Sequence, residues 1–297
     1  MGKGKILRDL IRTEQAVLAP GAYDALTALL IERAGFPAVY MSGFSVSATL
    51  TGAPDYGLVT QTEMSERART IAGAVSIPLI ADADTGYGNA INVRRTVREF
   101  ERAGAAGIHL EDQEFPKRCG HMQGKSVISM EEHVEKIRAA AAARSDPDFV
   151  IVARTDAAHI YGLDEAIRRG WAYLEAGADM LFIEPTNSRE DMEAIARAFK
   201  GIPLMTKIVE VPGFPAVTAP ELARMGYRII LFPISVLLGT AHAAMAALEA
   251  IRRDGSTAGL AGRLMTYDEL NDIVGLPDWE AWEHRFKHAD PDPVQGR

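Results

Sequence analysis

The sequence contains a single cysteine, Cys119, among its 297 residues. One cysteine excludes an internal disulfide framework and favours a reducing compartment. The sequence also lacks an apolar run of about 18 residues, the length that a membrane-spanning helix needs. No apolar segment of signal-peptide length follows the basic residues at the start of the chain. These absences predict a cytoplasmic protein that does not insert into a membrane.

Basic side chains are in the minority, with 32 Lys and Arg against 40 Asp and Glu, so the formal net charge is -8. The chain has no stripe rich in Lys and Arg, and this argues against nucleic acid as a partner. The hydrophobic fraction of 47% is that of a globular protein and excludes general disorder. The expected partner is therefore a small anionic molecule, held by a few well-placed cations.

Short apolar runs alternate with longer helical patterns along most of the chain, and glycines follow several of these helices. Runs that are hydrophobic throughout are typical of parallel strands buried on both faces. The expected strands are 16–19, 38–41, 79–83, 107–111, 149–153, 180–183, 203–206 and 228–232. Eight strand–helix units without a linker predict one closed (β/α)8 TIM-type barrel over residues 1–235. The alternative, an open doubly wound sheet, needs a phosphate-binding glycine motif that does not follow the first strand.

Residues 236–297 extend past the eighth strand, and their pattern predicts C-terminal helices that include 241–252 and 267–273. Aromatic side chains recur there at helical spacing, at Trp279, Trp282 and Phe286. Such a stripe can cover the barrel of its own chain or dock on another subunit. The residues alone leave both alternatives open.

The carboxyl ends of the strands in such a barrel face the active site. Six of the predicted strands end in polar or charged residues: Ser42 and Gly43, Asp82 and Asp84, Glu111, Arg154, Glu184, and Lys207. A single Asp at such a position is usually a helix N-cap. So many carboxylates in one place would repel one another without a bound cation, and this favours a catalytic site.

Asp82 and Asp84 alternate along a predicted strand, so we expect both side chains to point the same way. Together with Glu111 on the next strand they supply only hard oxygen ligands. This set suits Mg²⁺, with Mn²⁺ as a substitute, whereas the His and Cys spacing disfavours zinc. Arg154 can hold an anionic substrate with two parallel hydrogen bonds.

A second cluster, Lys117-Arg118-Cys119-Gly120-His121, follows the fourth strand. A thiol among three potential cations should have a lowered pKa, so that Cys119 could act as an acid, a base or a nucleophile. Gly120 gives the loop freedom to close over the site and exclude water.

The sequence resembles the isocitrate lyase and phosphoenolpyruvate mutase superfamily over nearly its whole length. The segments that carry the resemblance are DADTGYGN at 82–89, EDQ at 111–113, PKRCGH at 116–121 and ARTD at 153–156. The branch with 2,3-dimethylmalate lyase, petal death protein and methylisocitrate lyase is the most similar. The resemblance implies a barrel whose C-terminal helices swap onto a neighbouring subunit, in a homotetramer built from two such dimers.

The resemblance also implies roles for individual residues. It implies Mg²⁺ near Asp84, with Asp82, Glu111 and Asp112 holding it through waters. The α-oxyacid carboxylate would be bound by Tyr40, Ser42 and Gly43, with Arg154 assisting. Cys119 would be the catalytic acid, supported by His121 and Glu184 and carried on the Lys117–His121 loop with Arg118 and Gly120. Asp55 matches a further polar position of the site.

The implied reaction is Mg²⁺-dependent cleavage of a 2-hydroxydicarboxylate, such as a 2-alkylmalate, to an α-keto acid and a carboxylate. The base that removes the hydroxyl proton could be Tyr40, Asp55 or a metal-bound water. Two residues depart from the methylisocitrate lyase pattern. Leu238 stands where that pattern has a cation for a third substrate carboxylate. Lys207 stands where an asparagine is usual, which points to an added contact to a substrate anion.

Other functions remain open at this point. One is hydrolysis of oxaloacetate to oxalate and acetate, and another is an activity like that of carboxyphosphonoenolpyruvate phosphonomutase. A non-catalytic ligand sensor is a third alternative, which Asp84, Arg154 and Cys119 together make improbable.

Overall fold

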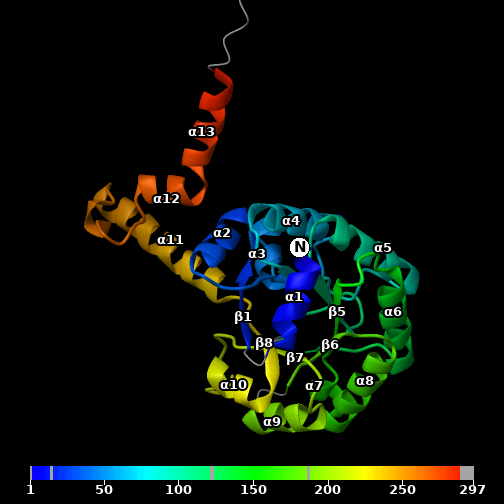
Figure 1. Cartoon of the computed structure of the whole chain (residues 1–297). Coiled ribbons are helices and arrows are strands. Elements are labelled where there is room, and N and C mark those ends of the chain that lie inside the picture. Colours follow the sequence, from blue (N-terminus) through cyan, green and yellow to red (C-terminus); the bar gives the residue numbers. More distant parts are fainter. Residues whose placement is uncertain (1, 14–15, 121–123, 186–187, 288–297) are drawn as a thin grey trace, which may run out of the picture. The chain divides into compact units, whose positions relative to one another are not determined.

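The computed structural model describes residues 2–13, 16–120, 124–185 and 188–287. In them, eight parallel strands form one closed barrel in sequence order, as Figure 1 shows. The strands are β1 (Val17–Ala22), β2 (Val39–Met41), β3 (Leu79–Asp82), β4 (Gly107–Glu111), β5 (Val150–Thr155), β6 (Met180–Ile183), β7 (Leu204–Lys207) and β8 (Tyr227–Phe232). The pairing of Val17 with Ile229 joins β1 to β8 and closes the barrel. The predicted (β/α)8 barrel is therefore confirmed.

The strand β1 extends three residues further than the sequence pattern predicts. Pro20 and Gly21 are typical of a turn, but here they continue the strand. A side chain at Gly21 would begin 2.2 Å from the carbonyl oxygen of Pro233, so only glycine allows this close approach of β1 to the residue after β8.

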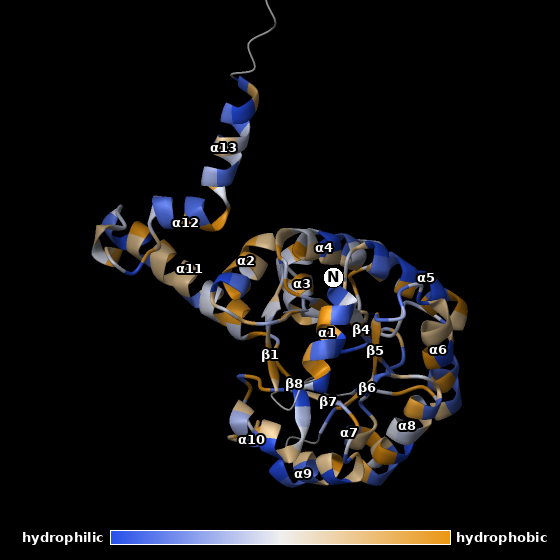
Figure 2. Cartoon of the chain, viewed as in Figure 1, coloured by the Kyte–Doolittle hydropathy of each residue, from blue (hydrophilic) through white to orange (hydrophobic). Residues whose placement is uncertain are grey.

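Helices surround the barrel and bury their apolar faces against the strands. Those between β1 and β8 are α2 (Ala25–Arg33), α3 (Gly43–Thr51), α4 (Gln61–Ala74), α5 (Ala90–Arg102), α6 (Met130–Ala143), α7 (Ala158–Tyr161), α8 (Leu163–Glu175), α9 (Arg189–Ala198) and α10 (Ala219–Met225). In α5, Val93, Val97 and Phe100 are buried, while its outer side is hydrophilic in Figure 2.

One further helix, α1 (Lys3–Arg12), closes the end of the barrel at which the strands begin (Figure 1). Leu7 and Ile11 of α1 belong to the same buried cluster as the inward-facing side chains of the strands. Arg8 donates hydrogen bonds to the carbonyl oxygens of Asp148 and Phe149, just before β5. The opposite end of the barrel, where the strands finish, remains for the functional site.

The chain divides into two compact units, residues 1–240 and 241–297. After β8 it continues in α11 (Ser235–Asp254), a short 3-10 helix (Ala258–Leu260), α12 (Tyr267–Ile273) and α13 (Leu276–Lys287). The helix predicted at 267–273 is confirmed, and Thr266 and Glu269 form a capping box at its start. No helix among the described residues is long and apolar enough to cross a membrane.

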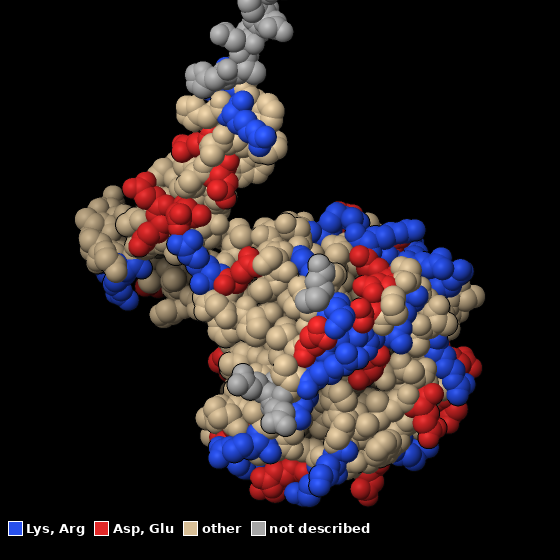
Figure 3. Space-filling view, viewed as in Figure 1, with Lys and Arg blue, Asp and Glu red and all other residues tan. Residues whose placement is uncertain are grey.

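Charged side chains of both signs are interspersed on the face drawn in Figure 3. One local concentration of positive charge lies on α5, where Arg94, Arg95, Arg98 and Arg102 line a shallow pocket. The other pockets of the described chain include a small one at the carboxyl ends of the strands.

Candidate functional site

A cavity of about 50 Å³ lies at the carboxyl ends of the strands. Most of the residues predicted for the site line it: Tyr40, Ser42, Asp55, Asp82, Glu111, Lys117, Arg118, Cys119, Gly120, Arg154 and Lys207. Gly43, Asp84 and Glu184 adjoin these residues through direct contacts. His121 lies outside the described residues. The predicted convergence of charged side chains is thus observed.

Strand β2 ends at Met41, and the next residue, Ser42, caps the start of α3. The backbone N–H of Gly43 donates a hydrogen bond of 3.2 Å to Oδ2 of Asp82 on the neighbouring strand. A Cβ atom at residue 43 would lie 2.6 Å from the same oxygen. Glycine therefore lets the Asp82 carboxylate approach the backbone of α3 closely.

Asp82 and Asp84 come together by a route that differs from the predicted one. Strand β3 ends at Asp82, and Asp84 has a left-handed backbone with φ of 47°. The expectation that both residues alternate along one strand was therefore wrong. The Asp82 carboxylate instead turns back to accept a hydrogen bond of 3.0 Å from the backbone N–H of Asp84. Non-glycine residues with positive φ are uncommon and concentrate at functional sites.

Lys117 connects two of the carboxylates around the cavity. Its Nζ lies 2.7 Å from Oδ1 of Asp84 and 2.8 Å from Asp55. Burial opposes the charge on Lys117, but the surrounding carboxylates outweigh it and raise the pKa of its amine well above the usual range. Lys117 is thus a fixed positive charge, and it belongs to the loop predicted to carry the site's chemistry.

Arg154, at the end of β5, is the second fixed cation. Its guanidinium lies 3.1 Å from Glu111, 3.0 Å from Asp156 and 3.8 Å from Glu184. The guanidinium carbon also lies 5.1 Å from the centre of the Phe182 ring, within the range of a cation–π contact. These contacts hold the guanidinium in one orientation at the wall of the cavity.

Lys207, at the end of β7, completes this wall. Its Nζ lies 2.7 Å from Oε1 of Glu184, and both side chains are buried. Gly120 packs directly against the wall, because a Cβ atom there would lie 2.8 Å from Arg154 and 3.2 Å from Lys207. The neighbouring Cys119 is partly buried and donates its backbone N–H to the carbonyl oxygen of Asp55 at 3.2 Å.

Asp112 turns away from the cavity, although the resemblance implied that it helps to hold the metal. Its carboxylate accepts hydrogen bonds from Thr155 at 2.6 Å, from the backbone N–H of Asp156 at 3.0 Å, and from Arg169 and Tyr173 at 2.9 Å each. Strand alternation explains the difference, since Glu111 and the next residue point to opposite faces. Asp112 therefore ties β4 to β5 and α8.

The buried charges at this end of the barrel are unbalanced among the described side chains. In the network of buried side chains around the cavity that includes Lys117 and Arg154, six carboxylates face four cations, an excess of two negative charges when all are ionised. The acids are Asp55, Asp82, Asp84, Glu111, Asp156 and Glu184, and the cations are Lys117, Lys125, Arg154 and Lys207. One divalent cation would supply the missing charge.

Two of these carboxyl groups have raised pKa values. Burial, together with the neighbouring Asp82 and Asp55, raises the pKa of Asp84 to about 7. Burial likewise raises the pKa of Glu111 well above its usual range. Oε1 of Glu111 is buried and has no hydrogen-bond partner among the described residues. Hard oxygen donors, surplus negative charge and an orphaned carboxylate oxygen fit Mg²⁺.

Among the described residues, no group of three or more His, Cys, Asp or Glu side chains is placed to hold a metal ion without rearrangement.

His109 belongs to the site, and the sequence reasoning missed it. Its Nε2 lies 2.8 Å from the hydroxyl of Tyr40 and 3.5 Å from Oδ1 of Asp82. Burial lowers the pKa of His109 to about 4, so the imidazole is neutral at pH 7. The signal was present, because residues two apart on a strand share a face and Glu111 was already assigned to the interior.

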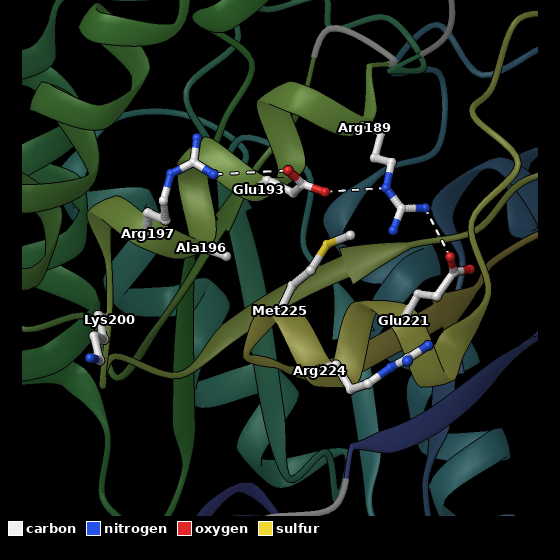
Figure 4. A pocket seen from close by; sticks show the side chains of 8 residues that line it. All are labelled: Arg189, Glu193, Ala196, Arg197, Lys200, Glu221, Arg224 and Met225. Carbon is white, nitrogen blue, oxygen red and sulfur yellow. Dashed lines mark hydrogen bonds and ion pairs between the residues drawn. The ribbon is translucent and has the colours of Figure 1, made fainter.

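A larger pocket of the described residues shares no lining residue with the strand-end cavity. It has a volume of about 600 Å³ and is lined by residues of α9, α10 and Lys200. Figure 4 shows Arg189 between Glu193 and Glu221, with nitrogen–oxygen distances of 3.2 and 2.9 Å. Its acidic side chains are thus already paired with arginine, and the strand-end cavity is the better candidate for chemistry.

The chain has close relatives of known name. Residues 7–252 match the family model of phosphoenolpyruvate phosphomutase. The chain is 47% identical to a protein of Eubacterium barkeri named 2,3-dimethylmalate lyase, over 94% of this chain and 96% of that protein.

Solved structures are similar as well. One is an oxaloacetate acetylhydrolase in complex with the inhibitor 3,3-difluorooxalacetate, with a TM-score of 0.91, 37% identity, and coverage of 96% of this chain and 97% of that chain. Another is a phosphonopyruvate hydrolase in complex with oxalate and Mg²⁺, with a TM-score of 0.87, 35% identity, and coverage of 97% and 100%. The fold, the ring of charged strand ends and these similarities together show that the chain belongs to the phosphoenolpyruvate phosphomutase family of enzymes.

Proposed function

We propose that the protein is a Mg²⁺-dependent carbon–carbon lyase. It cleaves a 2-hydroxydicarboxylate of the 2-alkylmalate type to an α-keto acid and a carboxylate. The observation that carries this proposal is one cavity that is lined both by carboxylates suited to a metal ion and by Cys119, Arg154 and Lys207. The similarity to a protein named 2,3-dimethylmalate lyase supports it.

Asp84 would hold the Mg²⁺ ion, together with Asp82 and Glu111. When bound, the ion polarises the 2-oxygen and the carboxylate beside it as a Lewis acid. The excess of two negative charges and the orphaned oxygen of Glu111 support this assignment, as does the oxalate and Mg²⁺ complex of the similar phosphonopyruvate hydrolase.

The carboxylate next to the 2-hydroxyl binds at Ser42 and Gly43, with Arg154 assisting. A base removes the hydroxyl proton, the bond between C2 and C3 breaks, and C2 becomes the carbonyl carbon of the α-keto acid. The electron pair of that bond passes to the other fragment, which leaves as an aci-carboxylate. Cys119 donates its thiol proton to the carbon of this fragment, and preorganised charge stabilises the transition state.

Asp55 is the better candidate for the base than Tyr40. Burial and the neighbouring Asp82 raise the pKa of Tyr40 well above its usual range, so its hydroxyl stays protonated at neutral pH. Tyr40 then serves as a hydrogen-bond donor beside His109. The carboxylate of Asp55 is paired with Lys117 and lines the cavity.

Lys207 supports a substrate with a second negative charge, because its side chain lines the cavity. Position 238, where the methylisocitrate lyase pattern has a cation for a third carboxylate, holds the apolar Leu238, so it offers no charge to such a group, and an unpaired carboxylate is costly to bury. A dicarboxylate therefore fits better than a tricarboxylate.

The size of the cavity supports movement of the segment 117–120. A volume of about 50 Å³ suits one or two water molecules, each of which takes up roughly 30 Å³ in the liquid. A dicarboxylate needs more room, so the segment that carries Lys117 and Cys119 opens for binding and closes for reaction.

We assign residues 236–297 to contacts between subunits. Their helices swap onto a neighbouring subunit, and two such dimers form a homotetramer. The exposed aromatic side chains of α13 support this assignment, as Trp279 is 70% exposed in the single chain. We also propose a cytoplasmic location, for which the single cysteine is the support.

Hydrolysis of oxaloacetate in the same site is the second candidate, and the similarity to oxaloacetate acetylhydrolase favours it. The test is a panel of 2-hydroxydicarboxylates and oxaloacetate with Mg²⁺, scored separately for α-keto acid and for oxalate. We expect an α-keto acid from a 2-alkylmalate.

Release of oxalate from oxaloacetate without cleavage of any 2-hydroxydicarboxylate would overturn the lyase in favour of the hydrolase. Full activity of Cys119→Ala on a phosphonate would instead support a phosphonomutase, in which Cys119 has no acid role. Binding of these acids without any product and without dependence on Mg²⁺ would support a ligand sensor.

A further inference from the structure

Lys125 follows the Cys119 loop in the sequence, and its side chain contacts two residues at the strand-end site. Its Nζ donates one hydrogen bond of 2.8 Å to the carbonyl oxygen of Gly120 and another of 2.8 Å to Oδ1 of Asp156. The side chain is only 5% exposed, although the backbone around it lies near the surface. The sequence reasoning assigned no role to this residue.

Both partners of Lys125 contact residues of the proposed catalytic site. Gly120 follows Cys119 directly and packs against Arg154 and Lys207. Asp156 accepts hydrogen bonds of 3.0 and 3.3 Å from Nε and Nη2 of Arg154. One ammonium group therefore joins the backbone beside the thiol to the carboxylate that orients the guanidinium.

The contacts of Asp156 make this junction rigid. Burial opposes its ionisation, but Arg154 and Lys125 outweigh burial and hold the pKa of Asp156 far below its usual range. The backbone N–H of Asp156 is anchored by Asp112, which is itself buried and fully bonded to β5 and α8. Asp156 is thus a fixed point to which Lys125 can attach the loop.

We propose that Lys125 is a positioning residue that sets the place of Cys119 relative to Arg154 by bonding Gly120 and Asp156 at once. It touches neither the substrate nor the reacting atoms. The proposal rests on the proposed lyase function for its effect on turnover, but its effect on Cys119 can be measured without any substrate.

The single cysteine of the chain provides a direct readout, because alkylation by N-ethylmaleimide reports on Cys119 alone. The rate is measured at increasing pH to its alkaline plateau, where the thiol is fully ionised and only access to the sulfur matters. Lys125→Met should raise this limiting rate about tenfold, the size expected for loss of one charge-assisted hydrogen bond. Lys125→Arg, which keeps the charge but not the geometry, should give an intermediate rate, and Lys200→Met, at an exposed lysine, the wild-type rate.

Turnover provides the second readout. With a 2-hydroxydicarboxylate that the wild-type enzyme cleaves, Lys125→Met should lower kcat at least about tenfold and change KM less, because the misplaced thiol acts in proton transfer more than in binding. Lys125→Arg should restore part of the loss.

Equal limiting alkylation rates in the wild type, Lys125→Met and Lys125→Arg would overturn the proposal. If Lys125→Met does not fold, as judged by circular dichroism, the comparison of Lys125→Arg with the wild type still decides, and equal rates again count against it. A wild-type enzyme that cleaves no 2-hydroxydicarboxylate would refute the lyase function, while the alkylation rates would still decide the role of Lys125.

Discussion

The packing around the Cα atom of Gly120 leaves no space for a side chain. We predict that Gly120→Ala lowers kcat/KM at least about tenfold, since its methyl group would displace the guanidinium of Arg154, now 2.8 Å from the position of the Cβ atom. The measurement is steady-state kinetics on the cleaved 2-hydroxydicarboxylate, together with the melting temperature.

A matched control for this substitution is Gly73→Ala in α4. No atom of the described residues lies within 4 Å of a Cβ atom at residue 73, and alanine favours helix by up to about 1 kcal/mol over glycine. This variant should keep full activity and melt at the same or a higher temperature. Full activity in Gly120→Ala would contradict the close packing of this residue on Arg154.

Cys119 is the proposed proton donor, and its replacement gives a second prediction. Cys119→Ser should lose roughly 100- to 10,000-fold in kcat, because a hydroxyl is a much weaker acid than a thiol. The fold should persist, since the residue is only partly buried. Rapid-quench measurement of the α-keto acid checks the loss, and unchanged turnover would refute the role of Cys119 as acid.

At the scale of whole elements, the barrel could be predicted from the sequence almost completely. Strands β4 and β6 begin and end where the hydrophobic pattern predicts, and the glycines predicted to end helices, such as Gly35, Gly104 and Gly177, have positive φ. Hydrophobic runs and helix stops are local signals, so one sequence suffices to read them.

The charged residues of the site could be predicted from the sequence, but the contacts among them could not. Alternation along β3 could not reveal the left-handed turn at Asp84, because the side chain of Asp84 contacts Lys117 from another segment and its backbone N–H bonds the Asp82 carboxylate. Lys125 was missed for a related reason. Its partners Gly120 and Asp156 come together only in the folded barrel, and a lone lysine in a loop is usually solvated.

Helix α1 gives a prediction that separates stability from activity. Arg8→Ala removes hydrogen bonds to Asp148 and Phe149 and an ion pair of 3.0 Å with Asp179. We expect a loss of about 1–3 kcal/mol in the free energy of unfolding and an unchanged kcat, because α1 closes the end of the barrel opposite the site.

Denaturant unfolding and steady-state kinetics check this prediction. Arg12→Ala is the matched control, since Arg12 is an exposed side chain on the same helix and its ion pair with Asp9 lies at the surface. It should leave stability within experimental error. A drop in kcat for Arg8→Ala would show that the two ends of the barrel are not independent.

At the scale of the whole molecule, stabilisation by Mg²⁺ should depend on pH. A carboxyl whose pKa is higher in the folded state binds more protons there, so it lowers stability as the pH rises between its unfolded and folded values. For Asp84 these values are 3.8 and about 7. Mg²⁺ replaces these protons and removes the repulsion, so the gain in melting temperature should grow from about pH 4 to 7 and then level off.

Comparison with and without Mg²⁺ at each pH cancels the opposite contributions of the buried, neutral His109 and His133. Differential scanning fluorimetry with chelator-treated protein provides the measurement. Asp84→Asn serves as the control and should show little gain from Mg²⁺ at any pH. A gain of equal size from pH 5 to 8 would contradict the proposed metal site.

Assembly provides the last prediction. Trp282 and Phe286 of α13 are each 59% exposed in the single chain, an unusual exposure for aromatic side chains. We expect light scattering to give the mass of a tetramer for the wild type and a smaller species for Trp282→Glu. A monomeric wild type would refute the proposed exchange of C-terminal helices.

Closure of the barrel has a consequence for synthesis of the chain on the ribosome. Strand β1 pairs with β2 on one side and with β8 on the other, and β8 is made about 200 residues later. Until residues 227–232 leave the exit tunnel, the nascent sheet keeps two open edges that can pair with other chains. The last strand therefore converts an aggregation-prone intermediate into a closed molecule, and a chain that ends before Phe232 should depend on chaperones to stay in solution.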